Sequence, residues 1–251
     1  MPNKSLGQHW LKDRQILQCI ADSVTISEND TVLEVGPGLG TLTSVLLARA
    51  KEVIAVEFDA DLAAKLPKQF PGKCLEVVHA DILQYDLAGL PGEYIVVANV
   101  PYYITSKILD RFLRAGNQPS ALVLLVQQEV AEKYAARSGQ LSASAVFLQA
   151  VYDVQLGIRV PKMHFTPPPK VDSQVLICKK HHVPKIAEKD LVRFRQLVNA
   201  GFSSPRKKLR STLAAGLQLE KSQVETLLTN AQIGVDLRAQ DLSVEDWQRL
   251  L

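Results

Sequence analysis

The chain has 251 residues, of which 47% are apolar and 22% charged, and its formal net charge is +3. No apolar run reaches the roughly 18 residues that a membrane-spanning helix needs. Residues 1–4 carry neither an apolar signal core nor an arginine-rich transit pattern. We therefore expect a globular, cytoplasmic protein without a membrane contact, built from one large domain and a small one.

Charge and cysteines restrict the possible partners. Residues 178–251 contain 13 Lys and Arg against 8 Asp and Glu, a balance of +5, whereas residues 1–177 contain 16 against 18, a balance of −2. The positive C-terminal part suggests a polyanionic partner. Three widely spaced cysteines form no metal-binding pattern, so we expect no metal ion and interpret them as buried thiols in a reducing compartment.

Strand-like and helical segments alternate through residue 127. Asp13 is expected to cap a first helix that carries Ile16, Leu17, Ile20 and Val24. Apolar runs predict strands at 31–35, 53–56, 75–79, 94–98 and 121–126, and helices begin at 41, 105 and 129. This alternation predicts an α/β fold, a mostly parallel sheet with helices on both faces. Two late strands, at 151–160 and 173–178, are expected to form a hairpin-like edge.

The composition becomes helical and basic after residue 182, so we place a domain boundary there, between domains 1–182 and 183–251. Helices are predicted at about 189–200, 206–216, 221–230 and 243–250, with Pro205 in the first turn of the second of them. The basic residues behind this proline are of the kind that binds phosphate backbones, and the alternative is a solvated helix face. They are Arg206, Lys207, Lys208 and Arg210.

Three strand ends carry residues suited to a nucleoside-containing cofactor. The sequence Gly-Pro-Gly-Leu-Gly at 36–40 follows the strand at 31–35, and glycines there allow a ligand to approach the backbone. It is not the dinucleotide fingerprint, because Thr41 occupies the place of the third glycine. Glu57 can accept hydrogen bonds from ribose hydroxyls, and Asp81 from the exocyclic amine of adenine. The alternatives are a tight turn, a helix-entry residue and a turn cap, respectively.

The sequence Asn-Val-Pro-Tyr at 99–102 follows the apolar run 94–98. An amide side chain, a backbone carbonyl before a proline and an aromatic ring together suit a planar base that carries an amine. A plain strand-to-loop turn is the alternative. Phe165 begins a loop with three consecutive prolines, which can hold this ring over the second face of a bound base, although a proline-rich connector is equally compatible.

These motifs together resemble the rRNA adenine N6,N6-dimethyltransferase family over essentially the whole chain. Two positions depart from the commoner pattern while staying apolar, Val100 in place of Leu and Trp10 in place of Phe. In addition, Ser203-Ser204-Pro205 precede the basic segment, where the family more often has Gln or Arg. The matching stretches are Gly-Gln-His-Trp-Leu at 7–11, Glu-Val-Gly-Pro-Gly-Leu-Gly at 34–40, Glu57, Ala-Asp at 80–81, Asn-Val-Pro-Tyr at 99–102, Phe-Thr-Pro-Pro-Pro-Lys-Val-Asp-Ser at 165–173 and Arg-Lys-Lys-Leu-Arg at 206–210.

The resemblance implies a class I methyltransferase fold, a Rossmann-like sheet that binds S-adenosyl-L-methionine, plus a small all-helical C-terminal domain that binds RNA. It assigns the methionine part of the cofactor to the glycine loop, the ribose to Glu57 and the adenine to Asp81, with Asn99 between cofactor and target. The implied cofactor residues are His9, Leu11, Gly36, Gly38, Gly40, Glu57, Asp81 and Asn99. The implied catalytic residues are Asn99, Val100, Pro101, Tyr102 and Phe165, and the RNA-binding residues are Lys170, Arg206, Lys207, Lys208 and Arg210.

The function that the resemblance implies is dimethylation of two adjacent adenosines near the 3′ end of the small-subunit rRNA during ribosome biogenesis, by a monomer acting on an assembly intermediate. Two alternatives stay open. One is the related large-subunit rRNA methyltransferase group that confers macrolide resistance. The other is a catalytically silent assembly or RNA-binding factor on the same fold, which the intact Asn99, Tyr102, Glu57 and Asp81 argue against. A DNA adenine methyltransferase fits the N-terminal motif and the basic C-terminal part less well.

Overall fold

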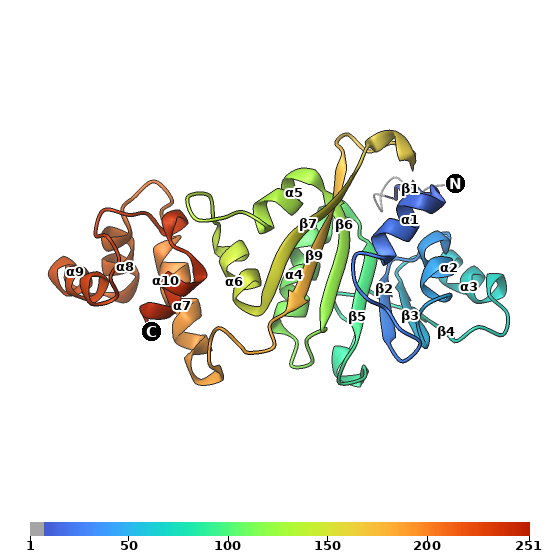
Figure 1. The fold of residues 1–251 in the computed structure, drawn as a ribbon, viewed down its shortest axis with the longest axis horizontal. Coiled ribbons are helices and arrows are strands. Elements are labelled where there is room, and N and C mark those ends of the chain that lie inside the picture. Colours follow the sequence, from blue (N-terminus) through green and yellow to red (C-terminus); the bar gives the residue numbers. More distant parts are fainter. Residues whose placement is uncertain (1–7) are drawn as a thin grey trace. The chain divides into compact units, whose positions relative to one another are not determined.

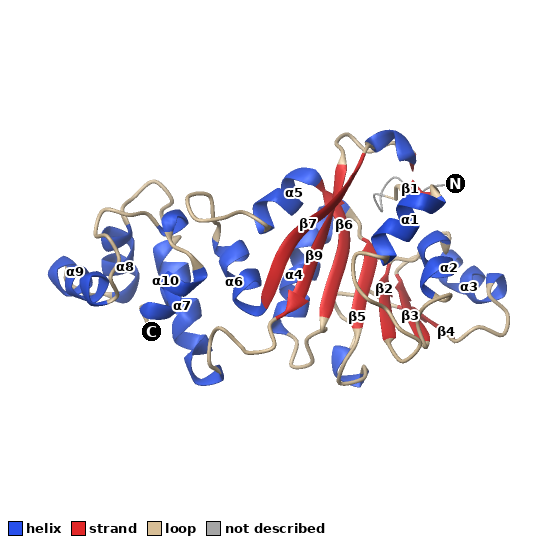
Figure 2. Ribbon diagram, viewed as in Figure 1, coloured by secondary structure: helices blue, strands red, loops and turns tan. Residues whose placement is uncertain are grey.

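The apolar runs form one seven-stranded sheet in the computed structural model, which describes residues 8–251 (Figure 1). Gly7 and residues 1–4, which entered the predictions above, lie outside the described residues. Helices and strands alternate along the first part of the chain (Figure 2). The strands are β1 (Trp10–Leu11), β2 (Thr31–Val35), β3 (Glu52–Glu57), β4 (Leu75–His79), β5 (Ile95–Asn99), β6 (Ala121–Gln127), β7 (Tyr152–Val160), β8 (Phe165–Thr166) and β9 (Ser173–Lys180). The helices are α1 (Arg14–Ala21), α2 (Thr41–Leu46), α3 (Ala60–Gln69), α4 (Thr105–Arg114), α5 (Gln128–Tyr134), α6 (Ala143–Val151), α7 (Leu191–Gly201), α8 (Leu209–Leu217), α9 (Lys221–Asn230) and α10 (Val244–Arg249).

The strand order of the sheet is β4-β3-β2-β5-β6-β9-β7. Strands β2 to β6 are parallel, and β9 is antiparallel to β6. The two late strands are hydrogen-bonded neighbours, with β7 at the edge. The order reverses between β2 and β5, and in open parallel sheets ligands bind at such a switch point, beyond the carboxyl ends of the strands.

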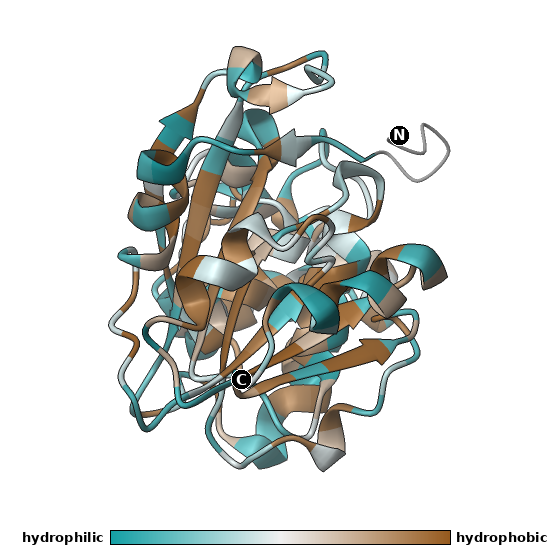
Figure 3. Cartoon of the chain, turned by 90° about the vertical axis from the view of Figure 1, so that its right-hand side faces the viewer, coloured by the Kyte–Doolittle hydropathy of each residue, from teal (hydrophilic) through white to brown (hydrophobic). Residues whose placement is uncertain are grey.

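Both faces of the sheet are covered, as predicted. Leu17 of α1 and Leu42 of α2 share one apolar cluster with alternate strand residues such as Val32 and Val97. The residues between them, such as Val96, point to the opposite face and are equally buried. In Figure 1, α1 lies in front of the sheet and α4 behind it. In Figure 3 the strands are mostly apolar, whereas the helices contain both apolar and polar residues.

The start of α1 agrees with the prediction, because the Asp13 side chain accepts hydrogen bonds from the backbone amides of Gln15 and Ile16. The helix ends at Ala21, so Val24 lies beyond it. The expectation of buried thiols is correct for Cys178 alone, since Cys19 and Cys74 are exposed. Cys19 lies in α1 and Cys74 directly precedes β4, whereas Cys178 lies within β9.

By internal contacts the chain divides into two compact units, Met1–Ala131 with Gln155–Lys180, and Glu132–Val154 with His181–Leu251. The second unit has its own core, in which α6 contributes Ala145 and Val146 beside Leu197, Leu213 and Trp247. The helix α6 was not predicted, because its apolar residues show little helical periodicity. The assignment of residues 183–251 as an RNA-binding domain stays a prediction.

The prediction that Pro205 occupies the first turn of a helix is wrong. The helix α8 begins at Leu209 with Lys208 as its N-cap, so Arg206 and Lys207 lie in the preceding turn. The turn is closed by a hydrogen bond from the Lys207 amide to the Ser204 carbonyl, at 3.0 Å. Proline at a helix start and proline in a turn look alike in sequence, because both conformations use the same φ.

Candidate active site

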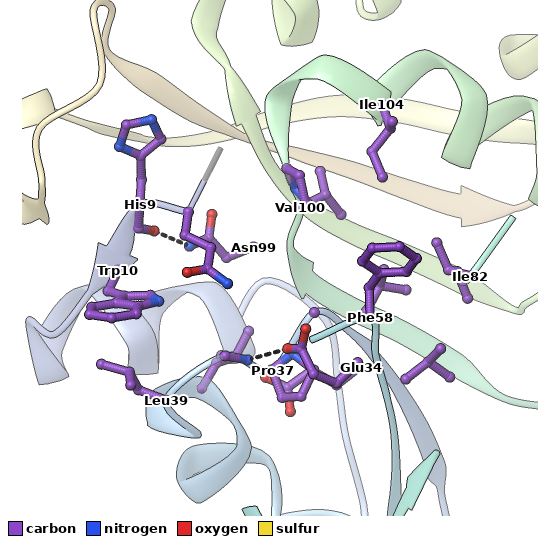
Figure 4. Close-up of a pocket in the computed structure, with 18 of the residues that line it drawn as sticks. His9, Trp10, Glu34, Pro37, Leu39, Phe58, Ile82, Asn99, Val100 and Ile104 are labelled. Atoms are coloured by element: carbon purple, nitrogen blue, oxygen red, sulfur yellow. Dashed lines mark hydrogen bonds between the residues drawn. The ribbon is translucent and has the colours of Figure 1, made fainter. Parts of the chain in front are cut away.

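A cavity of about 230 Å³ lies in the first unit where the strand order reverses (Figure 4). Its walls come from the N-terminal arm 8–11, the loop 36–39 after β2, the ends of β3 and β4, and the segment 99–104 after β5. The parallel strands place the four segments that follow β2, β3, β4 and β5 together, because the carboxyl ends of these strands meet at one edge. The fold therefore brings nearly all of the predicted cofactor residues to one place.

The glycine loop forms one wall in a left-handed conformation. Gly36, Gly38 and Gly40 have φ values of +67°, +56° and +78°, which side chains rarely adopt. A Cβ at Gly38 would lie 3.6 Å from the indole of Trp10, so this glycine faces the cavity. A Cβ at Gly40 would lie 2.7 Å from Cδ1 of Leu66 in α3. Gly40 is therefore required by packing against α3, and it does not line the cavity as its predicted cofactor role demands.

Glu57 is fixed at the end of β3 by two backbone amides. Its Oε2 accepts a hydrogen bond from the Gly38 amide and its Oε1 from the Asp59 amide, each at 2.9 Å. The residue is only 6% exposed. Each carboxylate oxygen can accept a second hydrogen bond. The arrangement therefore suits the two hydroxyls of a ribose. The hydrogen bond from the Asp59 amide also places Glu57 at the entry to α3, which was the alternative role.

Asp81 lines the cavity after β4. Its Oδ1 accepts a hydrogen bond from the Leu83 amide at 2.9 Å. The turn cap, weighed above as the alternative role, is therefore present. The second oxygen, Oδ2, stays available to accept from an amine on a ligand, so the two roles are compatible.

Two apolar residues follow these acids and were not predicted as site residues. Phe58 is 59% exposed, whereas Ile82 is buried, and both line the cavity. Figure 4 shows them close together, on the side of the cavity opposite Trp10 and Leu39. An aromatic ring and an aliphatic side chain beside Asp81 suit a flat purine. The signal that could have identified them is their position directly after a strand-end acid.

Glu34 is a buried acid in the wall of the cavity that sequence reasoning did not assign. Its side chain is 1% exposed, and the Thr43 hydroxyl donates to its Oε2 at 2.6 Å. Burial, and to a smaller extent the nearby charge of Glu57, raise the pKa of Glu34 to about 8, against the lowering effect of the hydrogen bond from Thr43. The carboxyl group therefore keeps its proton at neutral pH. Its place at the head of the Glu-x-Gly-x-Gly-x-Gly pattern was the available signal.

Asn99 ends β5 with a fixed amide orientation. Its Nδ2 donates to the backbone carbonyl of His9 at 3.2 Å (Figure 4). Because this bond occupies the amide nitrogen, Oδ1 is presented as a hydrogen-bond acceptor. Val100 and Pro101 continue the cavity wall beside it. The set of residues required to hold an amine-bearing base is therefore present at the end of the strand.

Tyr102 is held from two sides. Its ring stacks on the imidazole of His9, with centroids 5.8 Å apart and an interplanar angle of 21°. Its hydroxyl and that of the fully buried Ser173 are 2.5 Å apart. Burial raises the pKa of Tyr102, so the phenol is neutral and keeps this hydrogen bond. The ring is thus fixed in place before any base arrives.

The N-terminal arm is ordered over the cavity by the proline-rich loop. Strand β1 pairs antiparallel with β8, Trp10 opposite Thr166 and Leu11 opposite Phe165. The Nδ1–H of His9 donates to the carbonyl of Pro167, with 2.7 Å between nitrogen and oxygen. His9 and Leu11 accordingly line the cavity, as predicted.

The structure does not bring Phe165 into the cavity. The pairing of β8 with β1 turns its side chain inward, where it is 2% exposed and packs in the cluster that contains Leu11 and Val160. The sequence had instead predicted that this ring covers the second face of the bound base. The sequence was misleading here because the partner strand, β1, contains only two residues and shows no strand pattern of its own.

The predicted RNA-binding residues fall into two groups. Lys208 pairs with Asp236 at 2.7 Å, and Arg210 pairs with Glu225 at 2.8 Å. Arg206, Lys207 and Lys170 are exposed, and none of them has an ion pair with another described residue. Half of the basic segment is therefore engaged within the second unit, and half is available to a polyanion.

The sheet order, the left-handed glycine loop after its first parallel strand and the acids that end the next two strands define a class I, S-adenosylmethionine-dependent methyltransferase. The left-handed glycine loop and the doubly anchored Glu57, both in the cavity wall, fit this cofactor. A family model described as Ribosomal RNA adenine dimethylase matches residues 2–251. The chain belongs to this family, which confirms the predicted fold, enzyme class and methyl donor, with rRNA as the substrate.

The relatives and solved structures agree with this membership. The Ribosomal RNA small subunit methyltransferase A of Dehalococcoides mccartyi is 39% identical, over 98% of this chain and 86% of the relative. The protein of that name from a Nostoc species is 36% identical, over 99% and 96%. A dimethyladenosine transferase from Plasmodium falciparum has a TM-score of 0.84 at 25% identity, over 97% and 96%. The 23S rRNA methyltransferase ErmE has a TM-score of 0.82 at 29% identity, over 96% and 97%.

Proposed function

We propose that the protein transfers methyl groups from S-adenosylmethionine to the N6 amines of two adjacent adenosines near the 3′ end of the small-subunit rRNA, on a ribosomal assembly intermediate in the cytoplasm. The observation that carries the proposed chemistry is the fixed amide of Asn99, whose Oδ1 is left as an acceptor beside Tyr102. The choice of the small subunit rests on relatives of that name at 36–39% identity over nearly the whole chain.

The proposed role of Asn99 follows from the chemistry of the amine. The lone pair of an adenine N6 is delocalised into the ring, which makes the nitrogen a poor nucleophile. Acceptance of its two hydrogens by Oδ1 of Asn99 and the carbonyl of Val100 favours a pyramidal nitrogen with a localised lone pair. No strong base is required, because the N–H becomes acidic once the nitrogen is alkylated. Positioning of this kind can contribute on the order of 7–11 kcal/mol.

S-adenosylmethionine supplies the electrophilic methyl group in this scheme. Glu57 holds the ribose, Asp81 the adenine amine, and the loop at Gly36 and Gly38 the methionine part. Tyr102 stacks on the target base, which is worth roughly 1–3 kcal/mol. The target has to leave its RNA stack to enter the cavity. The proton-bearing Glu34 limits the negative charge around the cofactor to Glu57 and Asp81.

The exposed cations are proposed to hold the RNA backbone. Lys170 in the first unit and Arg206 and Lys207 in the second are exposed. Their contacts with phosphates release counterions, so the affinity should fall with rising salt. We propose that residues 183–251 form the RNA-binding domain and that the enzyme acts as a monomer without a metal ion. No helix of the described chain is long and apolar enough to cross a membrane.

Methyl transfer to three acceptors tests the proposal. Labelled S-adenosylmethionine is offered with unmethylated small subunits, with large subunits and with naked rRNA, and the product is mapped by mass. We expect dimethyladenosine confined to the 3′-terminal region of small-subunit RNA. Label in large-subunit RNA would instead favour the alternative represented by ErmE. An absence of label, with cofactor binding intact, would favour a silent assembly factor.

A further inference from the structure

Two indole N–H groups of the protein are buried and have no hydrogen-bond partner among the described residues. They belong to Trp10 and Trp247, the chain's two tryptophans. A buried donor without an acceptor costs free energy, so such groups are rare in folded proteins. Trp247 lies in the core of the second unit, whereas Trp10 lines the cavity of the active site. Only the Trp10 donor can therefore be satisfied by a ligand in the active site.

The position of Trp10 identifies the part of the cofactor that it meets. Its Nε1 would lie 3.6 Å from a Cβ at Gly38. Figure 4 shows the nitrogen of the indole on the side that faces the cavity, across from Phe58 and Ile82. In the proposed orientation the adenine lies beside Phe58 and Ile82 and the ribose on Glu57. The methionine part therefore extends toward Gly38 and Trp10.

The charges around the cavity restrict what the indole can bind. The acids Glu57 and Asp81 and the protonated Glu34 line it, and none of the described lining residues is Lys or Arg. Among these residues the carboxylate of the cofactor therefore meets uncharged donors, of which the indole N–H is one. The ammonium group of the cofactor has no lone pair and cannot accept from the indole. The carboxylate is thus the complementary partner for Trp10.

Two neighbouring side chains of the cavity wall already donate hydrogen bonds within the protein. The Nδ1–H of His9 donates to the Pro167 carbonyl, and Nδ2 of Asn99 donates to the His9 carbonyl. We propose that the Trp10 indole N–H donates a hydrogen bond to the methionine carboxylate of S-adenosylmethionine. The contact belongs to this chain in particular, because a phenylalanine at this position, the commoner residue in the resembling family, has no N–H to donate. The inference rests on the proposed orientation of the cofactor.

A ligand pair isolates the hydrogen bond from the apolar contact of the ring. S-Adenosylhomocysteine and S-adenosyl-3-thiopropylamine differ only in the carboxylate, and their dissociation constants are measured by calorimetry for the wild type and for Trp10→Phe. We expect Trp10→Phe to weaken the binding of S-adenosylhomocysteine about tenfold or more, the effect expected for loss of a hydrogen bond to a charged group. The same substitution should weaken the binding of S-adenosyl-3-thiopropylamine much less. The ratio of the two dissociation constants, which measures the preference for the carboxylate, should therefore fall about tenfold in the variant.

Trp247→Phe is the matched control, because it removes the other unpartnered indole N–H and leaves the cavity intact. Its affinity for both ligands should equal that of the wild type, and its remaining tryptophan, Trp10, should change fluorescence when S-adenosylhomocysteine binds. Melting temperatures verify that each variant is folded. Equal losses for both ligands in Trp10→Phe, or no loss for either, would overturn the inference. Failure of the wild type to bind S-adenosylhomocysteine would instead refute the proposed function.

Discussion

The cavity edge of the first unit and the basic segment of the second unit both carry charged or polar residues, but the protein uses them differently. At the cavity edge, neighbouring backbone groups hold the side chains of Glu57 and Asn99 in place. In the basic segment, Lys208 and Arg210 form ion pairs with acids of their own unit. A polar residue at a strand end is placed by topology, whereas the fate of a surface charge depends on partners distant in sequence. The first kind of site is therefore easier to predict.

The largest effect concerns the buried acid at the cavity edge. The folded-state pKa of Glu34, about 8, exceeds its usual value of 4.5, so the native state holds the proton more tightly than the unfolded state. The stability from this group is fully present below pH 4.5 and is lost as the pH rises through 8, by about 1.4 kcal/mol per pH unit. Glu34→Gln should remove this loss, as measured by denaturant unfolding at several pH values. Parallel profiles for both proteins would contradict the assignment.

The affinity for the cofactor product tests the role of Glu57 at the cavity edge. Both oxygens of the Glu57 carboxylate accept hydrogen bonds, whereas the amide of Glu57→Gln can accept at its single oxygen only. S-Adenosylhomocysteine should therefore bind roughly 10–100-fold more weakly to this variant. Calorimetry measures the change. Glu52→Gln is the matched control, because Glu52 lies at the opposite end of the same strand, where it accepts from the Thr31 hydroxyl. If the two variants bound the ligand equally well, Glu57 would have no role in holding the ribose.

Charge reversal tests the comparison in the second unit. Arg206→Glu with Lys207→Glu should weaken RNA binding about tenfold, and the log–log dependence of affinity on salt should become shallower by about 2. Lys208→Gln with Arg210→Gln removes charges that are already paired. We expect this second pair to lower stability by up to about 1 kcal/mol per ion pair, with a smaller effect on RNA binding. Equal losses of RNA affinity would mean that the internal ion pairs open in the complex.

A smaller effect is expected from the hydrogen bond that fixes Tyr102. Tyr102→Phe and Ser173→Ala each remove one partner of this bond, and each should reduce kcat several-fold, on the order of 1 kcal/mol, with little change in the KM for RNA. Because both substitutions break the same bond, the double variant should be no slower than the slower single variant. Multiplicative losses would show that the two hydroxyls act independently.

The site residues that could be predicted from the sequence are those that directly follow a parallel strand, because the end of the strand fixes their position. The apolar runs locate the ends of β2, β3, β4 and β5, and the parallel order then places the following residues together. The sequence did not predict the burial of Phe165, which depends on the register between the two-residue strands β1 and β8. Nor could it predict the ion pairs of Lys208 and Arg210, whose acidic partners lie 28 and 15 residues away. The protonated state of Glu34 similarly depends on packing around the strand interior.

The proposed role of Asn99 is tested most directly by single-turnover methyl transfer by Asn99→Ala to unmethylated small subunits, with cofactor and RNA affinities measured in parallel. We expect transfer to be lost while both affinities stay close to those of the wild type, because Oδ1 of Asn99 acts on the amine at the moment of attack. A rate equal to that of the wild type would contradict the central claim, since another group would then have to hold the amine of the target adenosine.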